Sequence, residues 1–196
     1  MRYAVVTGAG LEAAEKLREF GLSDHVVFHQ LDVADPASIA SFADFIKTKY
    51  GKLDILVNNA GIAGSIVDKD VLTASVLGMD EEGTNADVDW SKIATDTYEL
   101  AEECLKTNYN GAKGMIEALL PILQLSNSPR IVNVSSSFGH LKEIPSEWAK
   151  EVLDINHNIG YLTTDEGAES VVKLALLPND GPSGLFFSRN EVTTFD

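Results

Sequence analysis

The chain has 196 residues, and its 44% hydrophobic content is enough to build the core of a single globular domain. It carries 30 acidic against 15 basic residues, and the net charge of −15 argues against nucleic acid or an anionic membrane surface as a partner. The single cysteine, Cys104, excludes an internal disulfide and a multi-cysteine metal site, and it fits a reducing compartment.

Apolar segments of strand length alternate along the chain with amphipathic helical segments. This order is typical of an α/β fold in which a doubly wound parallel sheet carries helices on both faces, giving three layers. We expect one domain over residues 1–196, with strands at residues 3–7, 26–31, 53–57, 130–134 and 185–188. We expect helices at residues 11–20, 37–50, 90–120, 147–153 and 166–176.

The second helix has clear boundary signals. Asp35 is placed to cap its first turn, Pro36 suits its first position, and Gly51 is expected to end it. The stretch 66–89 shows no such signals, because it is acidic, contains glycine and is weakly periodic. We interpret that stretch as an inserted loop or a set of short helices.

Three expected strands run directly into small, polar, turn-forming residues. These transitions are Val5 to Gly10, Val57 to Gly61 and Val134 to Ser137. The carboxyl ends of parallel strands share one edge of a sheet, where α/β proteins receive nucleotides, so we expect one crevice at that edge. Gly8-x-Gly10-x-x-Ala13, followed by Asp32 at the next strand end, fits a dinucleotide fingerprint and would favour NAD(H). An ordinary glycine turn remains the alternative for this weak motif.

Several motifs together resemble the short-chain dehydrogenases/reductases, in particular the plant branch that contains menthol dehydrogenases and salutaridine reductase. The resemblance covers nearly the whole chain. It rests on Thr7-Gly8-Ala9, Phe28-His29-Gln30-Leu31-Asp32-Val33, Asn58-Asn59-Ala60-Gly61, Asn108-Tyr109-x-Gly111, Ile131 to Ser137 with Gly139, and Pro182-Ser183-Gly184-x-Phe186-Phe187. It implies a Rossmann-like sheet, NADP(H) as the cofactor with NAD(H) as the alternative, and a small apolar carbonyl substrate such as a terpenoid or alkaloid.

The resemblance also assigns roles to individual residues. Cofactor contacts are implied for the glycine turn, the acidic strand end and the third strand end, that is, for Thr7, Gly8, Gly10, Asp32, Val33, Asn59, Ala60 and Gly61. Ser136 would hydrogen-bond the substrate oxygen, and Asn108 would hold a water for proton relay. The insertion at about 66–96 is similar to one that covers a pairing surface elsewhere in the family, which implies a monomer.

Two family segments are absent from this chain. One βα unit is missing after Gly10, and the Tyr-x-x-x-Lys helix with its following strand is missing between Asp154 and Ile155. The sheet is therefore expected to be incomplete. The chain either represents a carbonyl reductase that works with those segments, or it is a truncated, inactive relative that at most binds nucleotide. For these 196 residues alone we expect no turnover, because carbonyl reduction requires a positioned acid.

The remaining candidate residues favour ordinary structural roles. Tyr109 and Lys113 form the one Tyr-x-x-x-Lys, but they precede the serine loop and are interpreted as helix-face residues. His29 is expected to pack in the core, Cys104 is expected to be inert, and the dispersed histidines suggest no metal site. No signal peptide and no membrane-length apolar run are visible, so we expect the cytosol.

Overall fold

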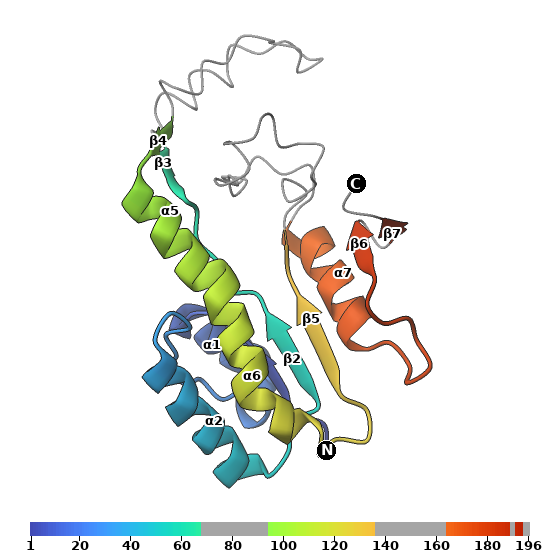
Figure 1. Ribbon diagram of the computed structural model, residues 1–196. Helices are drawn as coiled ribbons and strands as arrows, with labels where there is room; N and C mark the ends of the chain where they lie inside the picture. The colour runs from blue at the N-terminus through green and yellow to red at the C-terminus, as the bar shows by residue number, and fades with distance from the viewer. Residues whose placement is uncertain (68–93, 136–163, 189–190, 194–196) are drawn as a thin grey trace.

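A parallel sheet of three strands forms the centre of the protein. The computed structural model describes residues 1–67, 94–135, 164–188 and 191–193. Strands β1 (Ala4–Val6), β2 (Ile55–Asn58) and β5 (Arg130–Asn133) lie in the order β1-β2-β5 (Figure 1). In register, Val5 lies opposite Leu56, which lies opposite Ile131. The predicted parallel α/β fold is therefore confirmed, with β2 as the one described strand of this sheet that is paired on both edges.

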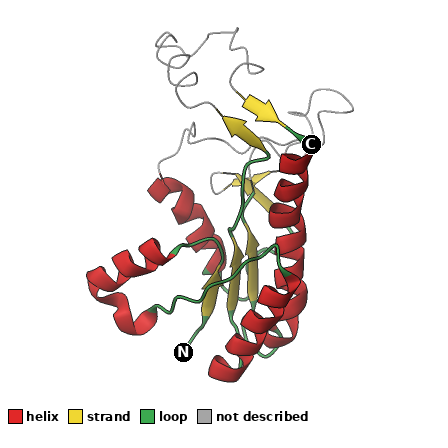
Figure 2. Ribbon diagram, turned by 90° about the vertical axis from the view of Figure 1, so that its left-hand side faces the viewer, coloured by secondary structure: helices red, strands yellow, loops and turns green. Residues whose placement is uncertain are grey.

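Helices cover both faces of this sheet, as Figure 2 shows. On one face α2 (Pro36–Tyr50) and α6 (Ala112–Leu123) enclose a core that includes Leu53 and Leu56, both fully buried. On the other face α7 (Thr164–Ala175) packs its Ala175 against Ile55, Val57 and Val132 of the strands. The three-layer arrangement expected from the sequence is thus present.

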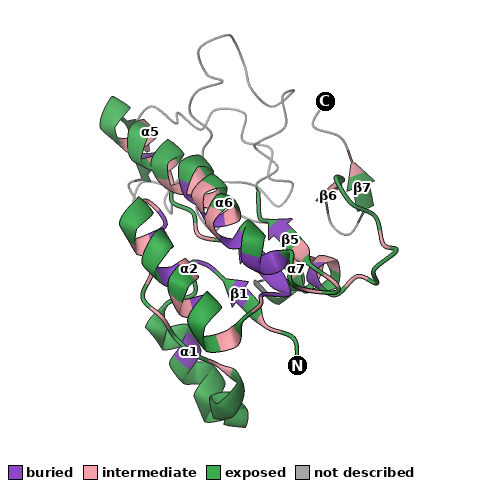
Figure 3. Cartoon of the chain, turned by 60° about the horizontal axis from the view of Figure 1, so that its bottom comes forward, coloured by how far each residue is buried: buried purple, intermediate pink, exposed green. Residues whose placement is uncertain are grey.

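The first helix is much less enclosed than the others. Helix α1 (Leu11–Leu17) runs into a π-helical turn, η1 (Arg18–Leu22), and a short 3-10 turn, η2 (Ser23–His25). Of these three elements only α1 buries a residue, Ala14, and Figure 3 shows their surfaces as largely exposed. Helix was predicted for 11–20, and the α-helical part ends earlier, at Leu17. None of the helices in the described ranges is long and apolar enough to cross a membrane.

The predicted boundary signals of α2 are confirmed. The Asp35 side chain accepts a hydrogen bond from the Ala37 N–H at 2.9 Å, and Pro36 occupies the first turn. Gly51 ends the helix with a φ of 72°, a conformation that glycine adopts without steric cost.

A long helix predicted to begin at Trp90 begins instead at Tyr98. Its three parts are α5 (Tyr98–Leu105), a π-helical stretch η3 (Lys106–Gly111) and α6. Thr97 caps the first turn, since its hydroxyl accepts a hydrogen bond from the Leu100 N–H at 3.2 Å. The residues just before this cap form a strand, β4 (Ala94–Asp96), which fixes the boundary; Trp90 lies outside the described residues.

The insertion is closed by a short antiparallel ladder. Strand β3 (Ser65–Val67) pairs with β4, and Ile66 lies opposite Thr95. The expectation of a loop or short helices over 66–89 therefore needs correcting at its start, where β3 forms, whereas β4 lies in the stretch that was predicted as helix from Trp90. The rest of the insertion, residues 68–93, lies outside the described residues.

The strand predicted at 26–31 is absent. This stretch is extended at Val26, but β1 is the outer strand of the sheet and no described strand lies beside 26–31. Its side chains pack on α2 instead, where the His29 ring lies 4.4 Å from the Phe45 ring centre. A strand needs a hydrogen-bonding neighbour, so the loss of the βα unit after Gly10 removes the partner that the pattern requires. His29 thus packs on aromatic rings as expected, but it is half-buried at the margin of the core rather than within it.

The last predicted strand forms, but outside the central sheet. Strand β6 (Phe186–Ser188) pairs antiparallel with β7 (Glu191–Thr193), and no pairing joins either strand to β5. The predicted strand at 185–188 is therefore confirmed in position, and it pairs with β7 rather than with the parallel sheet. The helix predicted at 147–153 lies outside the described residues.

Asp54 joins the amino-terminal ends of the strands. Its buried carboxylate accepts hydrogen bonds from the Tyr3 N–H at 2.8 Å, the Lys52 ammonium at 2.9 Å and the Ser126 hydroxyl. Burial alone would raise the pKa of this carboxyl, but the bonds from Ser126, Lys52 and Tyr3 outweigh it and lower the pKa from 3.8 to about 2. The ionised form thus holds β1, β2 and the turn before β5 together.

Asp54→Asn is expected to lower the free energy of unfolding at pH 7 by about 2 kcal/mol, the equivalent of the pKa depression. Because the folded pKa lies below that of the unfolded chain, the contribution is complete above about pH 4 and is lost as the pH falls towards 2. Urea unfolding between pH 7 and pH 3 measures this trend. The exposed Asp44→Asn is the control; equal losses in both variants would contradict the assignment.

Candidate functional site

The buried Thr7 hydroxyl joins the end of β1 to the loop that follows β2. Its Oγ1 accepts hydrogen bonds from the backbone N–H groups of Asn59, at 3.0 Å, and Ala60, at 2.9 Å. The Asn59 side chain returns the contact by donating from Nδ2 to the Thr7 carbonyl at 3.0 Å. Two of the three loops that the sequence predicts to converge are therefore fastened to each other at the carboxyl edge of the sheet.

Gly8 is required by the same junction. Its φ is 80°, and a Cβ placed on it would lie 2.8 Å from the Cα of Ala60. Any side chain here would both strain the backbone and push the two loops apart. Glycine at this position is thus explained by the approach of the Ala60 backbone, independently of any ligand.

Asn108 anchors the loop after β2 to the long helix made of α5, η3 and α6. Its Oδ1 accepts from the Ile62 N–H, and its Nδ2 donates to the Ile62 carbonyl, both at 2.9 Å. The same Nδ2 lies 3.3 Å from the Cys104 sulfur, and the thiol is directed to the Ile62 carbonyl at 3.6 Å. The side chain of Asn108 therefore holds the loop after Gly61, and the water-holding role implied by the resemblance stays a prediction.

The loop that contains Asp32 and Val33 reaches this helix at Gly111. A Cβ on Gly111 would lie 2.9 Å from the Val33 side chain and 3.0 Å from its carbonyl oxygen, so only glycine fits. Val33 itself is buried in the core beneath the edge. Its neighbour Asp32 is exposed and accepts a hydrogen bond from the Ala34 N–H at 2.8 Å. The motif Asn108-x-x-Gly111 thus fastens two loops to one helix.

An amide pair marks the end of β5. Asn58 Nδ2 donates to Asn133 Oδ1 at 2.8 Å, and the two residues are direct register partners. The Asn58 Oδ1 is buried without a hydrogen-bond partner. Ser135 follows at the same edge and is exposed, whereas Ser136 lies outside the described residues. The junction of Gly8 with Asn59 is confirmed, and the predicted position of Ser136 stays a prediction.

The glycine turn fits the phosphates of a dinucleotide. Gly10 precedes α1, makes no side-chain cap hydrogen bond, and a Cβ placed on it would meet nothing within 4 Å. Open space before the first N–H groups of a helix suits an anion. The exposed Asp32 carboxylate is of a type that hydrogen-bonds ribose hydroxyls. These features leave room for the phosphates and ribose of a nucleotide, and the cofactor contacts implied by the resemblance stay predictions.

The other half of a reductase site is not supplied by the candidates that can be described. Tyr109 is exposed on η3, and the Lys113 ammonium lies 3.9 Å from the Glu117 carboxylate rather than next to a phenol. Burial raises the pKa of the Cys104 thiol, which keeps it protonated and agrees with the expected inert role. In the ranges that the structure covers, no cluster of His, Cys, Asp and Glu could hold a metal.

Three positions at this edge were not predicted as functional. Ile62 supplies the backbone that Asn108 grips, Gly111 admits Val33, and Asn58 pairs with Asn133. A signal for the last pair exists in the sequence, because two apolar strands both end in Val-Asn. Ile62 offers no such signal, since its contribution comes from backbone atoms.

Comparison with known proteins places the chain among well-characterised folds. A family model described as short chain dehydrogenase matches residues 3–147. The chain is 40% identical to (+)-neomenthol dehydrogenase of Capsicum annuum over 272 aligned positions, covering 95% of this chain and 86% of that protein. The structure of salutaridine reductase from Papaver somniferum is similar at a TM-score of 0.76 and 39% identity, covering 89% and 86%. Menthone neomenthol reductase from Mentha piperita also gives 0.76, at 35% identity, covering 97% and 99%.

The length of the alignment carries separate information. Its 272 positions exceed the 196 residues of the chain. The Capsicum annuum protein therefore contains residues, inside the aligned region, that have no counterpart here. This agrees with the two internal gaps that the resemblance implied.

Thr7→Val is expected to lower the free energy of unfolding by about 2 kcal/mol, because it leaves the N–H groups of Asn59 and Ala60 without their acceptor. Urea unfolding measures the change. Thr48→Val is the matched control, since Thr48 is exposed on α2. If Thr7→Val were no more damaging than the control, the junction would not stabilise the edge.

Proposed function

Because the chain belongs to the short-chain dehydrogenase/reductase family, we propose that its function is the NADP(H)-dependent reduction of a ketone or enone in a small apolar molecule. Relatives named neomenthol dehydrogenase, salutaridine reductase and isopiperitenone reductase support a terpenoid or alkaloid as the substrate. The structural observation that carries the proposal is the edge at which Thr7 joins the glycine turn to Asn59 and Ala60.

The nucleotide would be held by residues of this edge. Gly10 and the first N–H groups of α1 would receive the phosphates, and Asp32 would accept hydrogen bonds from the ribose. Thr7 and Asn108 would not contact the nucleotide. They would keep the loops in place through hydrogen bonds to the backbone of Asn59, Ala60 and Ile62. When bound, the reduced nicotinamide supplies hydride to the carbonyl carbon.

The substrate oxygen gains negative charge during this reaction and needs donors. Ser136 is the residue expected to hydrogen-bond that oxygen. A hydroxyl of ordinary acidity stabilises the charge, but a second, acidic group must deliver the proton. The chain lacks the Tyr-x-x-x-Lys that follows the serine loop in the family, so we expect nucleotide binding without turnover from these 196 residues alone.

The three-stranded sheet favours a second candidate, a truncated relative without activity. Both β1 and β5 have one edge that no described strand covers. Such edges are costly and promote association between chains. We nevertheless retain the reductase as the family function, and we propose a monomer on the basis of the insertion and a reducing compartment on the basis of the single cysteine.

Gly10→Val is expected to fold like the parent chain, because a Cβ on Gly10 meets open space and its φ of −69° suits any residue. Millimolar NADP⁺ is expected to raise the Tm of the parent chain, and Gly10→Val should abolish this rise, since the added side chain would occupy the phosphate position. Gly167→Val is the control, because Gly167 also faces open space. A rise in Tm that survives in Gly10→Val would exclude the glycine turn as the nucleotide site.

A chimera that receives the missing segments from Papaver somniferum salutaridine reductase is expected to oxidise NADPH with menthone or salutaridine. Ser136→Ala in that chimera should reduce kcat by roughly two orders of magnitude, because it removes a donor to the developing oxyanion. Absorbance at the nicotinamide band measures the rate. The chain of 196 residues is the negative control, and an unchanged rate for Ser136→Ala would exclude its assigned role.

A further inference from the structure

A cleft of about 1750 Å³ runs along the outer edge of β5. It is lined by every residue from Pro129, before the strand, to Ser135, after it, and on the far side by the stretch from Pro182 to Ser188. The cleft therefore follows the length of the strand and is not confined to the crevice beyond the carboxyl edge. Its shape is that of a slot beside a strand.

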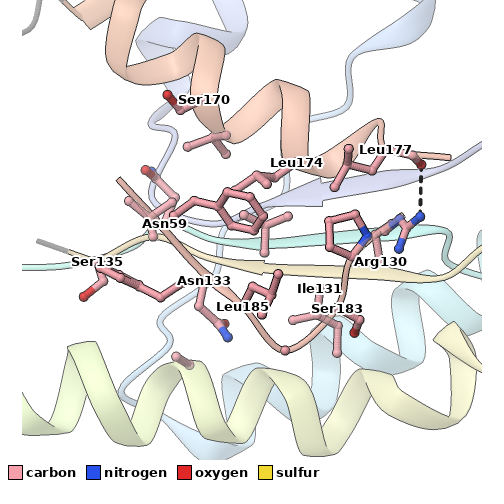
Figure 4. Close-up of a pocket in the computed structure, with 18 of the residues that line it drawn as sticks. Asn59, Arg130, Ile131, Asn133, Ser135, Ser170, Leu174, Leu177, Ser183 and Leu185 are labelled. Atoms are coloured by element: carbon pink, nitrogen blue, oxygen red, sulfur yellow. Dashed lines mark hydrogen bonds between the residues drawn. The ribbon is translucent and has the colours of Figure 1, made fainter. Parts of the chain in front are cut away.

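The slot lies between two helix layers. Ile116 of α6 lines it from one face of the sheet, and Val171 and Leu174 of α7 line it from the other. Figure 4 shows Leu174 and Ser170 on α7 to one side, the ribbon of α6 on the opposite side, and β5 between them. The slot thus continues the middle layer of the protein, where a further strand of the sheet would lie.

One end of the slot is closed. The Arg130 guanidinium donates to the Leu177 carbonyl at 3.1 Å and also to the Pro178 carbonyl, which ties the chain after α7 to the start of β5 (Figure 4). Beyond this tie, β6 pairs with β7 and leaves the edge of β5 uncovered by described strands. The far wall is therefore fixed at its base, and no strand of the described ranges fills the space along β5.

The backbone of β5 can accept a partner. Arg130 and Val134 direct their N–H groups to Asp54 and Asn58 of the β2 side, both at 2.9 Å. Because N–H groups alternate between the two edges of a strand, those of Ile131 and Asn133 face the slot. The side chains of Ile131 and Val134 are 38% and 43% exposed, which is high for β-branched residues of an internal sheet layer.

We propose that this slot binds one extended, apolar peptide segment, which adds to β5 as a further strand. The relatives supply the argument for that occupant, because their aligned regions contain residues that this chain lacks. Strand addition supplies main-chain hydrogen bonds to Ile131 and Asn133, and the apolar walls of α6 and α7 select β-branched side chains. The proposal is independent of redox activity, since it concerns the edge of β5 and not the nucleotide loops.

The test uses fluorescein-labelled peptides of about 12 residues that tile the parts of Papaver somniferum salutaridine reductase without a counterpart here. Anisotropy titrations with the 196-residue chain need neither cofactor nor substrate, so their outcome does not depend on the proposed function. One β-branched-rich peptide is expected to bind saturably, and the others are not. The bound peptide should slow amide exchange at Ile131 and Asn133 by at least about tenfold and leave Val132 unchanged.

Two exposed leucines give a matched pair of variants. Leu185→Asp lies in the slot and should weaken peptide binding by about tenfold or more, whereas Leu125→Asp, on the turn after α6, should change it less than about twofold. N-methylation of alternate peptide residues should also abolish binding to the unaltered chain, which guards against a folding defect in Leu185→Asp. Absence of saturable binding would overturn the proposal. A self-associated form that protects Ile131 and excludes the peptide would also overturn it, by identifying a second copy as the occupant.

Discussion

Every element that positions the candidate site depends on β2 being enclosed on all sides. Its two edges pair with β1 and β5, and its two faces are covered by α2 with α6 and by α7. At one end of it Asp54 gathers the chain through three hydrogen bonds, and beyond its other end the Thr7 hydroxyl holds two backbone amides of the following loop. Each of these contacts is directed towards β2 and its flanking residues, not across the outer edges of β1 and β5. The nucleotide side of the site therefore rests on the part of the sheet that retains its neighbours.

The sequence was sufficient where a structure is decided by nearby residues. Asp35, Pro36 and Gly51 set the limits of α2, and the alternation of strands and helices indicated the layers. The strand predicted at 26–31 was wrong, because a strand also requires a hydrogen-bonding partner that local composition does not reveal. The start of the long helix at Tyr98 depends on a cap and on the β3–β4 pairing across the insertion, which no window around Trp90 contains.

The candidate site divides in the same way. Gly8 was identified as part of a nucleotide motif, but the structure explains the need for glycine there by the close approach of the Ala60 backbone. Gly111 belonged to a motif of the resemblance without an assigned role. The structure shows that glycine is needed there because Val33 packs directly against its backbone. Asn108 was expected to hold a water, which stays a prediction, and the structure shows that its side chain holds the Ile62 backbone. Motif matching therefore located the right loops, while the physical task of each residue required coordinates, because close packing between distant segments leaves no local trace.

The β3–β4 ladder brings the two ends of the inserted segment together. Val67 and Ala94 are cross-strand partners, so the chain departs from the domain and returns to it at one place. The entropic cost of closing a loop rises only slowly with its length. Segments of very different length can therefore be closed by the same pair of strands at a similar cost in free energy. A change in the length of the segment between Val67 and Ala94 is consequently expected to cost the parallel sheet little stability.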